Sequence, residues 1–466
     1  MSEGLILIPL AAILLCNLPL GFLRKAAHPF SVIFTIFQAA TAVAYPWTGA
    51  SCFFFDLRAD NLSRVMLLAI SIVTLTSLMV GRSTITDEKK RFQFTNLLLL
   101  AVIGMNGIVM VADVFSLYVF VEIVAVASFI LIAFHKDKDG LEGAFKYVVL
   151  SAVATVMMLS SIALLLMVAG NTTFSAVASA LAAPTGRHPL ILLAVAVFLC
   201  GLLVKSGIMP FHGWLPDAYT AAPAATSVLL AGIVTKTTGV YVLLRLVQTV
   251  FGFSGSISAV LMLTAAASIV LGAFAALGQG DFKRMLAYSS ISQVGYIVLG
   301  FAVGTPLAMA GAVFHLFNHS VFKALLFVNA AAVEQQTGTR NMDRLGGLSA
   351  RMPVTGFSCL AGLLSTAGVP PFAGFWSKLI IVVALWQAGY IGYAVTAILA
   401  SLLTLAYFLL MQRRIFFGKL RAGLENTREA GLGILVPELL LALITLGLGL
   451  LIPLLFGTFI LPIKGI

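Results

Sequence analysis

Apolar residues fill this chain in long runs, and polar residues are mostly confined to the short stretches between those runs. The runs are about 17 to 25 residues long, which is what an α-helix needs to cross the hydrocarbon core of a bilayer. We therefore predict an all-α, polytopic membrane protein of about 14 transmembrane helices. The predicted spans cover residues 4–22, 30–47, 61–81, 93–111, 114–134, 144–169, 190–209, 222–249, 257–278, 284–304, 306–333, 354–389, 391–415 and 434–461.

Two of these regions contain residues that break helices. The run at 354–389 is too long for one simple helix and contains Gly368 followed by two prolines, so we predict two half-helices there. The stretch from Lys205 to Lys236 also has several glycines and prolines between its lysines. A lysine beside an interrupted span is typical of an ion pathway, because the break frees backbone groups and admits water. The alternative is a loop with a snorkelling lysine at each edge.

The two interrupted regions carry related sequences. Residues 207–214 are GIMPFHGW and residues 368–375 are GVPPFAGF, and both fit the pattern G-[IV]-x-P-F-x-G-[WF]. An odd number of predicted passes separates them, which indicates an inverted-topology repeat with one discontinuous helix in each half. Chance similarity between two hinges rich in glycine and proline is the alternative. The predicted organisation is 1–92 for three N-terminal spans, 93–250 and 251–420 for the two inverted repeats, and 421–466 for a final span.

Composition supports a membrane location and argues against a nucleic-acid partner. Charged residues make up 10% of the chain, against roughly 25% in soluble proteins. The net charge is +11, but 19 of the 28 Lys and Arg residues fall on one side of the predicted spans and five on the other. This asymmetry places the basic loops in the cytoplasm and both termini outside, as expected for a multi-pass protein of the inner (cytoplasmic) membrane. This division of Lys and Arg between the two sides treats Arg64, Arg245 and Lys283 as loop residues.

Five ionisable residues lie well inside predicted spans. A charge near the centre of a membrane helix costs about 2.5–3.5 kcal/mol, so these side chains are expected to face the bundle interior, to be paired or to be neutral. Glu122 is taken as the only acid deep in a span, and Lys205 is its best candidate partner. Such a pair is either a static bridge or a switch that drives proton transfer. The five residues are Glu122, Lys205, Lys236, Lys323 and Lys378.

Histidines add a polar stripe to the second half. His315, His319 and Lys323 recur at i, i+4 and i+8, so they share one helix face. An HxxxH pair can bind zinc, but no further ligand is evident. The stripe is therefore either a satisfied core feature or a hydrated proton path. His212, in the first broken-helix motif, is a candidate proton relay or half-helix cap, and Asp113 begins the helix that carries Glu122.

The sequence gives no sign of a redox centre. Cys16, Cys52, Cys200 and Cys359 are isolated, so we predict neither an iron–sulfur cluster nor structural zinc, and no cofactor in this chain. A dinucleotide fingerprint and a paired axial-ligand motif are also lacking, which argues against a catalytic redox subunit. A structural scaffold and a stand-alone solute transporter remain as alternatives.

At several motifs the chain resembles the antiporter-like subunits of respiratory complex I, of membrane-bound hydrogenases and of Mrp cation/proton antiporters. The resemblance covers nearly all of residues 55–420, and it looks strong for D-type Mrp subunits and the hydrogenase subunits related to them. The motifs are DVFSLYVFVEIVAVASFIL (113–131), the stretch 205–241, GDFKRMLAYSSISQVGY (280–296), HLFNHSVFKALLF (315–327) and AGVPPFAGFWSK (367–378).

The resemblance implies a non-redox, ion-translocating subunit of a larger complex, built on two inverted repeats of about five helices. In that family a Glu–Lys pair, a central lysine and a distal lysine carry protons. These match Glu122, Lys205, Lys236 and Lys378, and the two histidines of the stripe match the connection between half-channels. The implied partners are other membrane subunits, with a hydrophilic redox arm in the respiratory and hydrogenase complexes. In an Mrp antiporter, sodium exchange is expected instead.

Overall fold

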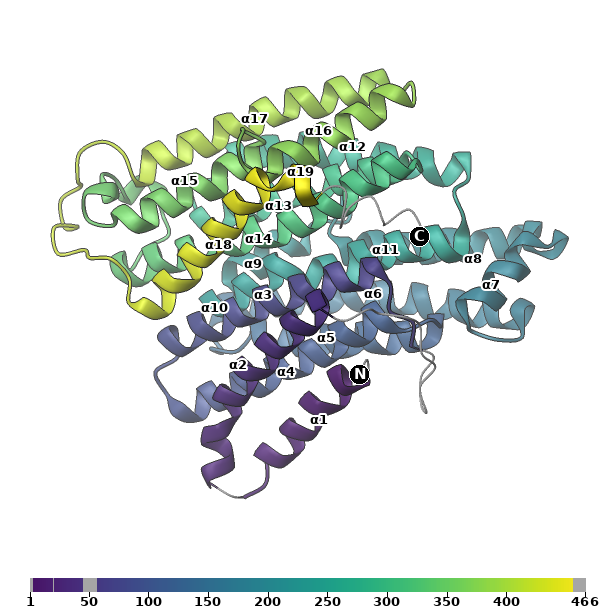
Figure 1. Ribbon diagram of the computed structural model, residues 1–466, viewed down its shortest axis with the longest axis horizontal. Coiled ribbons are helices and arrows are strands. Elements are labelled where there is room, and N and C mark those ends of the chain that lie inside the picture. The colour runs from purple at the N-terminus through teal and green to yellow at the C-terminus, as the bar shows by residue number, and fades with distance from the viewer. Residues whose placement is uncertain (1–2, 20, 45–56, 456–466) are drawn as a thin grey trace.

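The computed structural model describes residues 3–19, 21–44 and 57–455, and helices dominate them (Figure 1). The principal helices are α1 (Gly4–Cys16), α2 (Gly21–Ala44), α3 (Asn61–Thr84), α4 (Glu88–Met110), α5 (Val114–Ile132), α6 (Lys138–Ala169), α7 (Phe174–Ala182), α8 (Pro189–Ser206), α9 (Trp214–Ala221), α10 (Ala224–Leu229), α11 (Val242–Leu246), α12 (Gly255–Leu277), α13 (Phe282–Ala302), α14 (Pro306–Thr337), α15 (Pro353–Ala367), α16 (Ala373–Gln387), α17 (Ile391–Ile415), α18 (Leu432–Leu450) and α19 (Ile452–Leu455).

The predicted all-α membrane fold is confirmed. Within the described residues, 12 helices are long and apolar enough to cross a membrane, and α1, α15 and α16 are shorter apolar helices. The number of crossings and the inverted relation of the repeats stay predictions. The first boundary was wrong, because α1 ends at Cys16 and α2 already begins at Gly21. Residues 45–47 and 456–461 of two predicted spans lie outside the described part of the chain.

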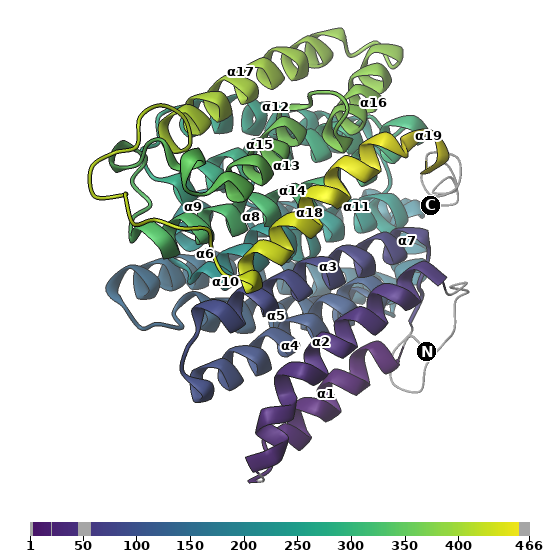
Figure 2. The same cartoon turned by 60° about the vertical axis from the view of Figure 1, so that its left-hand side comes forward.

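Two central helices organise the bundle. The helix that runs over Ala224–Phe251 and helix α14 are buried along their whole apolar windows. Figure 1 shows α1, α2, α4 and α5 on one side of this centre and α12, α15, α16 and α17 on the other. Figure 2 shows α18 crossing obliquely between them, and α18 packs against α3, α14, α15 and α16. The last long helix therefore ties both halves together.

Both predicted helix breaks are present. Helix α8 ends at Ser206 and α15 ends at Ala367, and each is followed by a capping glycine with a positive φ, Gly207 at 64° and Gly368 at 84°. Residues with a Cβ atom adopt this conformation at a cost in free energy, which explains the glycine at both positions. The second half-helices, α9 and α16, begin after the breaks at Trp214 and Ala373.

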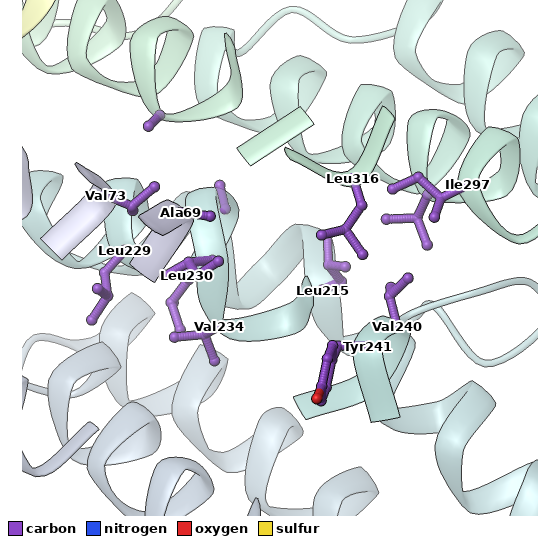
Figure 3. Close-up of a cluster of buried hydrophobic side chains, with 14 of the residues drawn as sticks. Ala69, Val73, Leu215, Leu229, Leu230, Val234, Val240, Tyr241, Ile297 and Leu316 are labelled. Atoms are coloured by element: carbon purple, nitrogen blue, oxygen red, sulfur yellow. The ribbon is translucent and has the colours of Figure 1, made fainter. Parts of the chain in front are cut away.

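The helix over Ala224–Phe251 contains three π-helical segments that the sequence did not predict, namely Leu230–Val234, Lys236–Tyr241 and Val247–Phe251. A π segment adds a residue to a turn and is frequent at functional sites. Gly239 lies in the second segment, where a Cβ atom would come within 2.5 Å of the Ser206 backbone. Figure 3 shows the apolar core around this helix, formed by Ala69, Val73, Leu215, Leu229, Leu230, Val234, Val240, Tyr241, Ile297 and Leu316.

Candidate functional site

The first element of the site is an ion pair at the end of α8. Lys205 lies in the last turn of that helix and is 4% exposed. Its Nζ donates to Glu122 Oε1 on α5 at 2.9 Å and to Ser151 Oγ on α6 at 2.7 Å. Thr155 Oγ1 also donates to Glu122 Oε1, at 2.7 Å. The predicted pairing of Glu122 with Lys205 is therefore present, and two hydroxyl groups surround it.

The pair is asymmetric in its exposure. The Glu122 side chain is 28% exposed and the Lys205 side chain is 3% exposed. The acid therefore faces the edge of the bundle while the base points inward. Opening this pair would leave a buried ammonium without its counter-ion, which strongly favours loss of its proton. The geometry thus allows the state of Glu122 to control whether Lys205 holds a proton.

Lys236 begins the second π segment and is completely buried. Its Nζ donates to the backbone carbonyl of Ala231, five residues earlier in the same helix. Within the described residues, no carboxylate lies within salt-bridge distance of this lysine. Lys236 therefore lies in an uncharged environment, with a backbone carbonyl as its hydrogen-bond partner.

Lys378 lies on α16, shortly after the second helix break, and is 5% exposed. Its Nζ is 3.4 Å from Ser401 Oγ on α17 and 4.3 Å from the centre of the Tyr296 ring on α13. Tyr296 and Ser401 also share a hydrogen bond of 2.9 Å. Like Lys236, Lys378 therefore has neutral partners, here a hydroxyl group and an aromatic face.

The predicted stripe on α14 lies inside the bundle. His315 and His319 stack with ring centroids 6.3 Å apart, and His315 Nδ1 shares a 2.8 Å hydrogen bond with Ser377 Oγ. Both ring nitrogens of His319 and Nε2 of His315 have no hydrogen-bond partner among the described residues. Within the described residues, no third His, Cys, Asp or Glu lies close enough to form a metal site with the two histidines.

Lys323 extends the stripe toward α13. Its Nζ donates to Ser289 Oγ at 2.8 Å and to the Leu286 carbonyl at 3.2 Å, and Tyr407 donates to the same Ser289 hydroxyl at 2.8 Å. Lys323 interacts electrostatically with both Lys236 and Lys378.

Two predicted supporting residues have other local contacts. Asp113 caps the N-terminus of α5, where its carboxylate accepts from the Ser116 N–H at 2.8 Å. His212 is partly exposed in the first helix break, with its ring 6.4 Å from that of Tyr288. Within the described residues, neither Asp113 nor His212 forms a hydrogen bond with one of the buried lysines. Their part in a proton path stays a prediction.

One statement from the sequence was wrong, because Glu122 is not the only acid deep in a span. Glu438 lies on α18, is completely buried and shares a 3.1 Å hydrogen bond through its Oε2 with Thr355 Oγ1. Its position inside the predicted span 434–461 was the signal that should have revealed it. The burial cost that singled out Glu122 applies to Glu438 with greater force.

Two cations that were counted as loop residues are also buried. Arg245 lies on α11 and forms a two-pronged pair with Asp60, the N-cap of α3. Lys283 is 1% exposed on α13 and pairs with Glu334 on α14 at 2.9 Å. Both had been assigned to loops because predicted span ends are uncertain by several residues.

The Lys283–Glu334 pair lies at a surface opening. A cavity of about 390 Å³ is lined by both residues together with His135 and Arg340. A smaller cavity of about 180 Å³ lies nearby, lined in part by Asp217, which pairs with Lys146 and Arg284. This end of the bundle therefore has two charged surface cavities, lined in part by residues of α13 and α14.

Comparison with known proteins gives a consistent result. Residues 111–417 match the family described as NADH:quinone oxidoreductase/Mrp antiporter, TM. The chain is 35% identical over 358 residues to NADH-quinone oxidoreductase subunit N of Desulforudis audaxviator, covering 76% of this chain and 71% of the relative. It is 31% identical over 394 residues to the D-type subunit of the Na(+)/H(+) antiporter of Alkalihalophilus pseudofirmus, covering 84% and 80%.

Solved structures extend the likeness to the whole fold. A chain of the Mrp complex from Dietzia sp. superimposes with a TM-score of 0.89 at 25% identity, covering 99% of this chain and 96% of that one. A chain of the membrane-bound sulfane sulfur reductase, an archaeal respiratory membrane complex, gives 0.88 at 27% identity, covering 100% and 97%. The superpositions cover nearly every residue of this chain.

Proposed function

This chain belongs to the NADH:quinone oxidoreductase/Mrp antiporter membrane family, and we propose from that premise that it moves protons along Glu122, Lys205, Lys236 and Lys378. It is an antiporter-like subunit, and its proposed host is a multisubunit complex related to respiratory complex I, either an oxidoreductase or an energy-converting hydrogenase. Lys323 and the two stacked histidines support the path between the two half-channels. Electron transfer would then take place in other subunits.

The Glu122–Lys205 contact is the observation that carries this proposal. With the pair closed, the carboxylate holds a proton on Lys205. When the pair opens, Lys205 becomes a buried ammonium without a counter-ion, so its proton can move toward Lys236. Lys236 and Lys323 then relay the proton, and the distal Lys378 releases it. Hydroxyl groups beside these lysines supply short relay steps.

Ion transport in inverted membrane vesicles that contain the intact complex tests the proposal. Lys205→Ala and Glu122→Ala should each abolish ion transport while the complex still assembles. Lys419→Ala, which removes an exposed lysine from a loop, is the matched control and should transport normally. Normal transport by both Lys205→Ala and Glu122→Ala would overturn the proposal.

A second candidate is the D-type subunit of an Mrp sodium/proton antiporter. The identity to the D-type subunit of an Na(+)/H(+) antiporter and the likeness to the Dietzia Mrp complex favour it. Co-purification separates the two candidates. A nickel–iron or iron–sulfur partner would indicate a hydrophilic redox arm, whereas only small membrane partners together with sodium-dependent transport would indicate the antiporter.

The proposed setting is the inner membrane, with lipid around the bundle and both termini outside. The asymmetry of Lys and Arg between alternate loops supports this orientation. A purely structural scaffold is the remaining alternative. If Glu122→Gln and Lys205→Met lower only the thermal stability and leave ion transport per assembled complex unchanged, the scaffold role would replace the transport role.

A further inference from the structure

A buried carboxyl group lies apart from the lysine row, at the other end of the second broken helix. Glu438 is on α18, fully buried, within a helix that is otherwise almost entirely apolar. Thr355, in the first turn of α15, contacts it, while Lys378 lies beyond the break on α16. The proposed proton path does not use Glu438, although a buried acid in a membrane helix is costly to keep.

The groups around Glu438 supply no positive charge. Glu429 and the Cys359 thiol are the titratable groups that interact with it electrostatically. The helices packed against α18 carry Arg64 and Arg82 (α3), His315, His319, Lys323 and Glu334 (α14), and Lys378 (α16). Within the described residues, none of their nitrogens lies within 4.0 Å of a Glu438 oxygen. An unpaired carboxylate would be very unfavourable here, whereas a neutral carboxylic acid would not.

The single hydroxyl hydrogen of Thr355 also indicates that Glu438 is a neutral carboxylic acid. Its single hydroxyl group lies 2.9 Å from Glu429 Oε2 and 3.1 Å from Glu438 Oε2, but it can donate to only one of them. Glu429 also accepts from the backbone N–H groups of Val354 and Thr355 at the start of α15, so it acts as the acceptor in its contacts with that helix. Thr355 therefore donates to Glu429, and the hydrogen between Thr355 and Glu438 comes from Glu438.

Groups on α14 and α15 also lie beside Glu438. The side chains of Asn329 and Ser358 lie against the carboxyl group, and Asn329 donates to Ser358 Oγ at 2.7 Å. Glu438 Oε1 and Asn329 Oδ1 are buried acceptors with no hydrogen-bond partner among the described residues. Asn329 follows Lys323 by about 9 Å along the same helix. Glu438 thus lies between a partly exposed carboxylate and the helix that carries the central polar row.

We propose that Glu429, Thr355 and Glu438 form a proton-loading site that supplies the second half of the pathway from the end of the bundle where the α17–α18 loop lies. In the resting state Glu429 is a carboxylate and Glu438 is a carboxylic acid. When Glu438 releases its proton toward α14, the Thr355 hydroxyl group turns from Glu429 to donate to the Glu438 carboxylate, and Glu429 takes a proton from water and passes it to the Thr355 oxygen. Thr355 gives its own hydrogen to Glu438, so both carboxyl groups and the hydroxyl group return to their starting states.

This site deepens the proposed function and rests on it. Infrared difference spectroscopy of the intact complex in membranes should show the carbonyl-stretch band of a protonated carboxylic acid that is lost in Glu438→Gln. The glutamine amide can still donate to Thr355, so assembly should persist. Glu425→Gln, an exposed acid in the same loop, is the control and should keep the band. A band unchanged in Glu438→Gln, or one displaced by sodium at constant pH, would overturn the site.

Transport measurements on Thr355 separate a relay from a structural contact. Thr355→Val keeps the shape of the side chain but removes the hydroxyl group, whereas Thr355→Ser keeps that group. We expect Thr355→Ser to transport at least about tenfold faster than Thr355→Val, and equal rates would contradict the relay. In the same vesicles, Lys205→Ala reports on the lysine pathway. If it abolishes transport while the Thr355 variants are equal, the loading site is wrong and the proposed function stands.

Discussion

Lys378 shows how closely the backbone and a buried charge depend on each other. Gly368 caps α15 at a φ of 84°, and a Cβ atom there would lie 3.0 Å from Lys378 Cδ. The glycine therefore serves two purposes: it allows the helix to end, and it leaves space for the lysine stem to reach Tyr296 and Ser401. Neither purpose depends on the other, so substitutions can separate them.

Gly368→Ala should lower both stability and ion transport. The left-handed conformation costs an L-residue about 1–2 kcal/mol, and the new methyl group would push Lys378 from its position. Gly170→Ala is the matched control, because Gly170 also caps a helix at positive φ but has open space around its Cβ position. Both variants should melt at lower temperature in detergent. Only Gly368→Ala should reduce transport per assembled complex, and equal transport in the two variants would contradict a positioning role.

At the scale of elements, the helix breaks were predictable and the π segments were not. The two G-x-x-P-F motifs contain residues that cannot continue a helix, so their effect is local and visible in the sequence. A π turn differs from an α turn only in which carbonyl each N–H bonds to, and it has no residue pattern of its own. The segment around Lys236 therefore looks like an ordinary apolar span until neighbouring helices are placed against it.

The candidate site was predictable to a similar extent. Lysines stand out in apolar spans, and Glu122 could be matched to Lys205 because each is costly alone. The partners of Lys236 and Lys378 are a carbonyl, a hydroxyl group and an aromatic ring, which occur throughout the chain and carry no comparable signal. Glu438 and Arg245 were missed because they lie near span ends, where a polar residue is usually taken to be hydrated.

The Asp60–Arg245 pair links two elements, since it joins the start of α3 to the central helix. Asp60→Asn should isolate its contribution, because asparagine caps a helix as well as aspartate does but accepts only part of the guanidinium's hydrogen bonds. The free energy of unfolding is expected to fall by about 2 kcal/mol. This value is toward the lower end for a charged hydrogen bond, because the Asp60 side chain is 37% exposed. Thermal melting in detergent at neutral pH measures it.

The effect of this pair on stability should depend on pH. Burial acts to raise the pKa of Asp60, but the hydrogen bonds and charge of Arg245 outweigh it and hold the pKa below its ordinary value. A depressed carboxyl pKa stabilises the fold above the pKa of the unfolded chain, and this contribution is lost as the pH falls through the folded value. The gap in melting temperature between wild type and Asp60→Asn should therefore close in acid. If this difference in melting temperature stays constant as the pH falls below the folded pKa of Asp60, the ion pair is not its cause.

At the scale of the whole molecule, the exposed apolar surface determines where partners can lie. Helix α5 turns Val119 and Val126 outward, 37% and 42% exposed, on either side of the partly exposed Glu122. An acid that opens onto bare lipid would be unfavourable, so this face is expected to be covered in the assembled complex. The family relatives that form multisubunit membrane complexes fit this expectation.

A photo-crosslinking amino acid at Val126 should therefore form an adduct with another polypeptide when the intact complex is illuminated in membranes. The same amino acid at Val124, which is fully buried on α5, is the control and should give no adduct between chains. The result is read as a shift in mass of the labelled chain. If position 126 labels only lipid while the complex is intact, the Glu122 face is not an interface, and opening of the Glu122–Lys205 pair would have to be driven from within this chain.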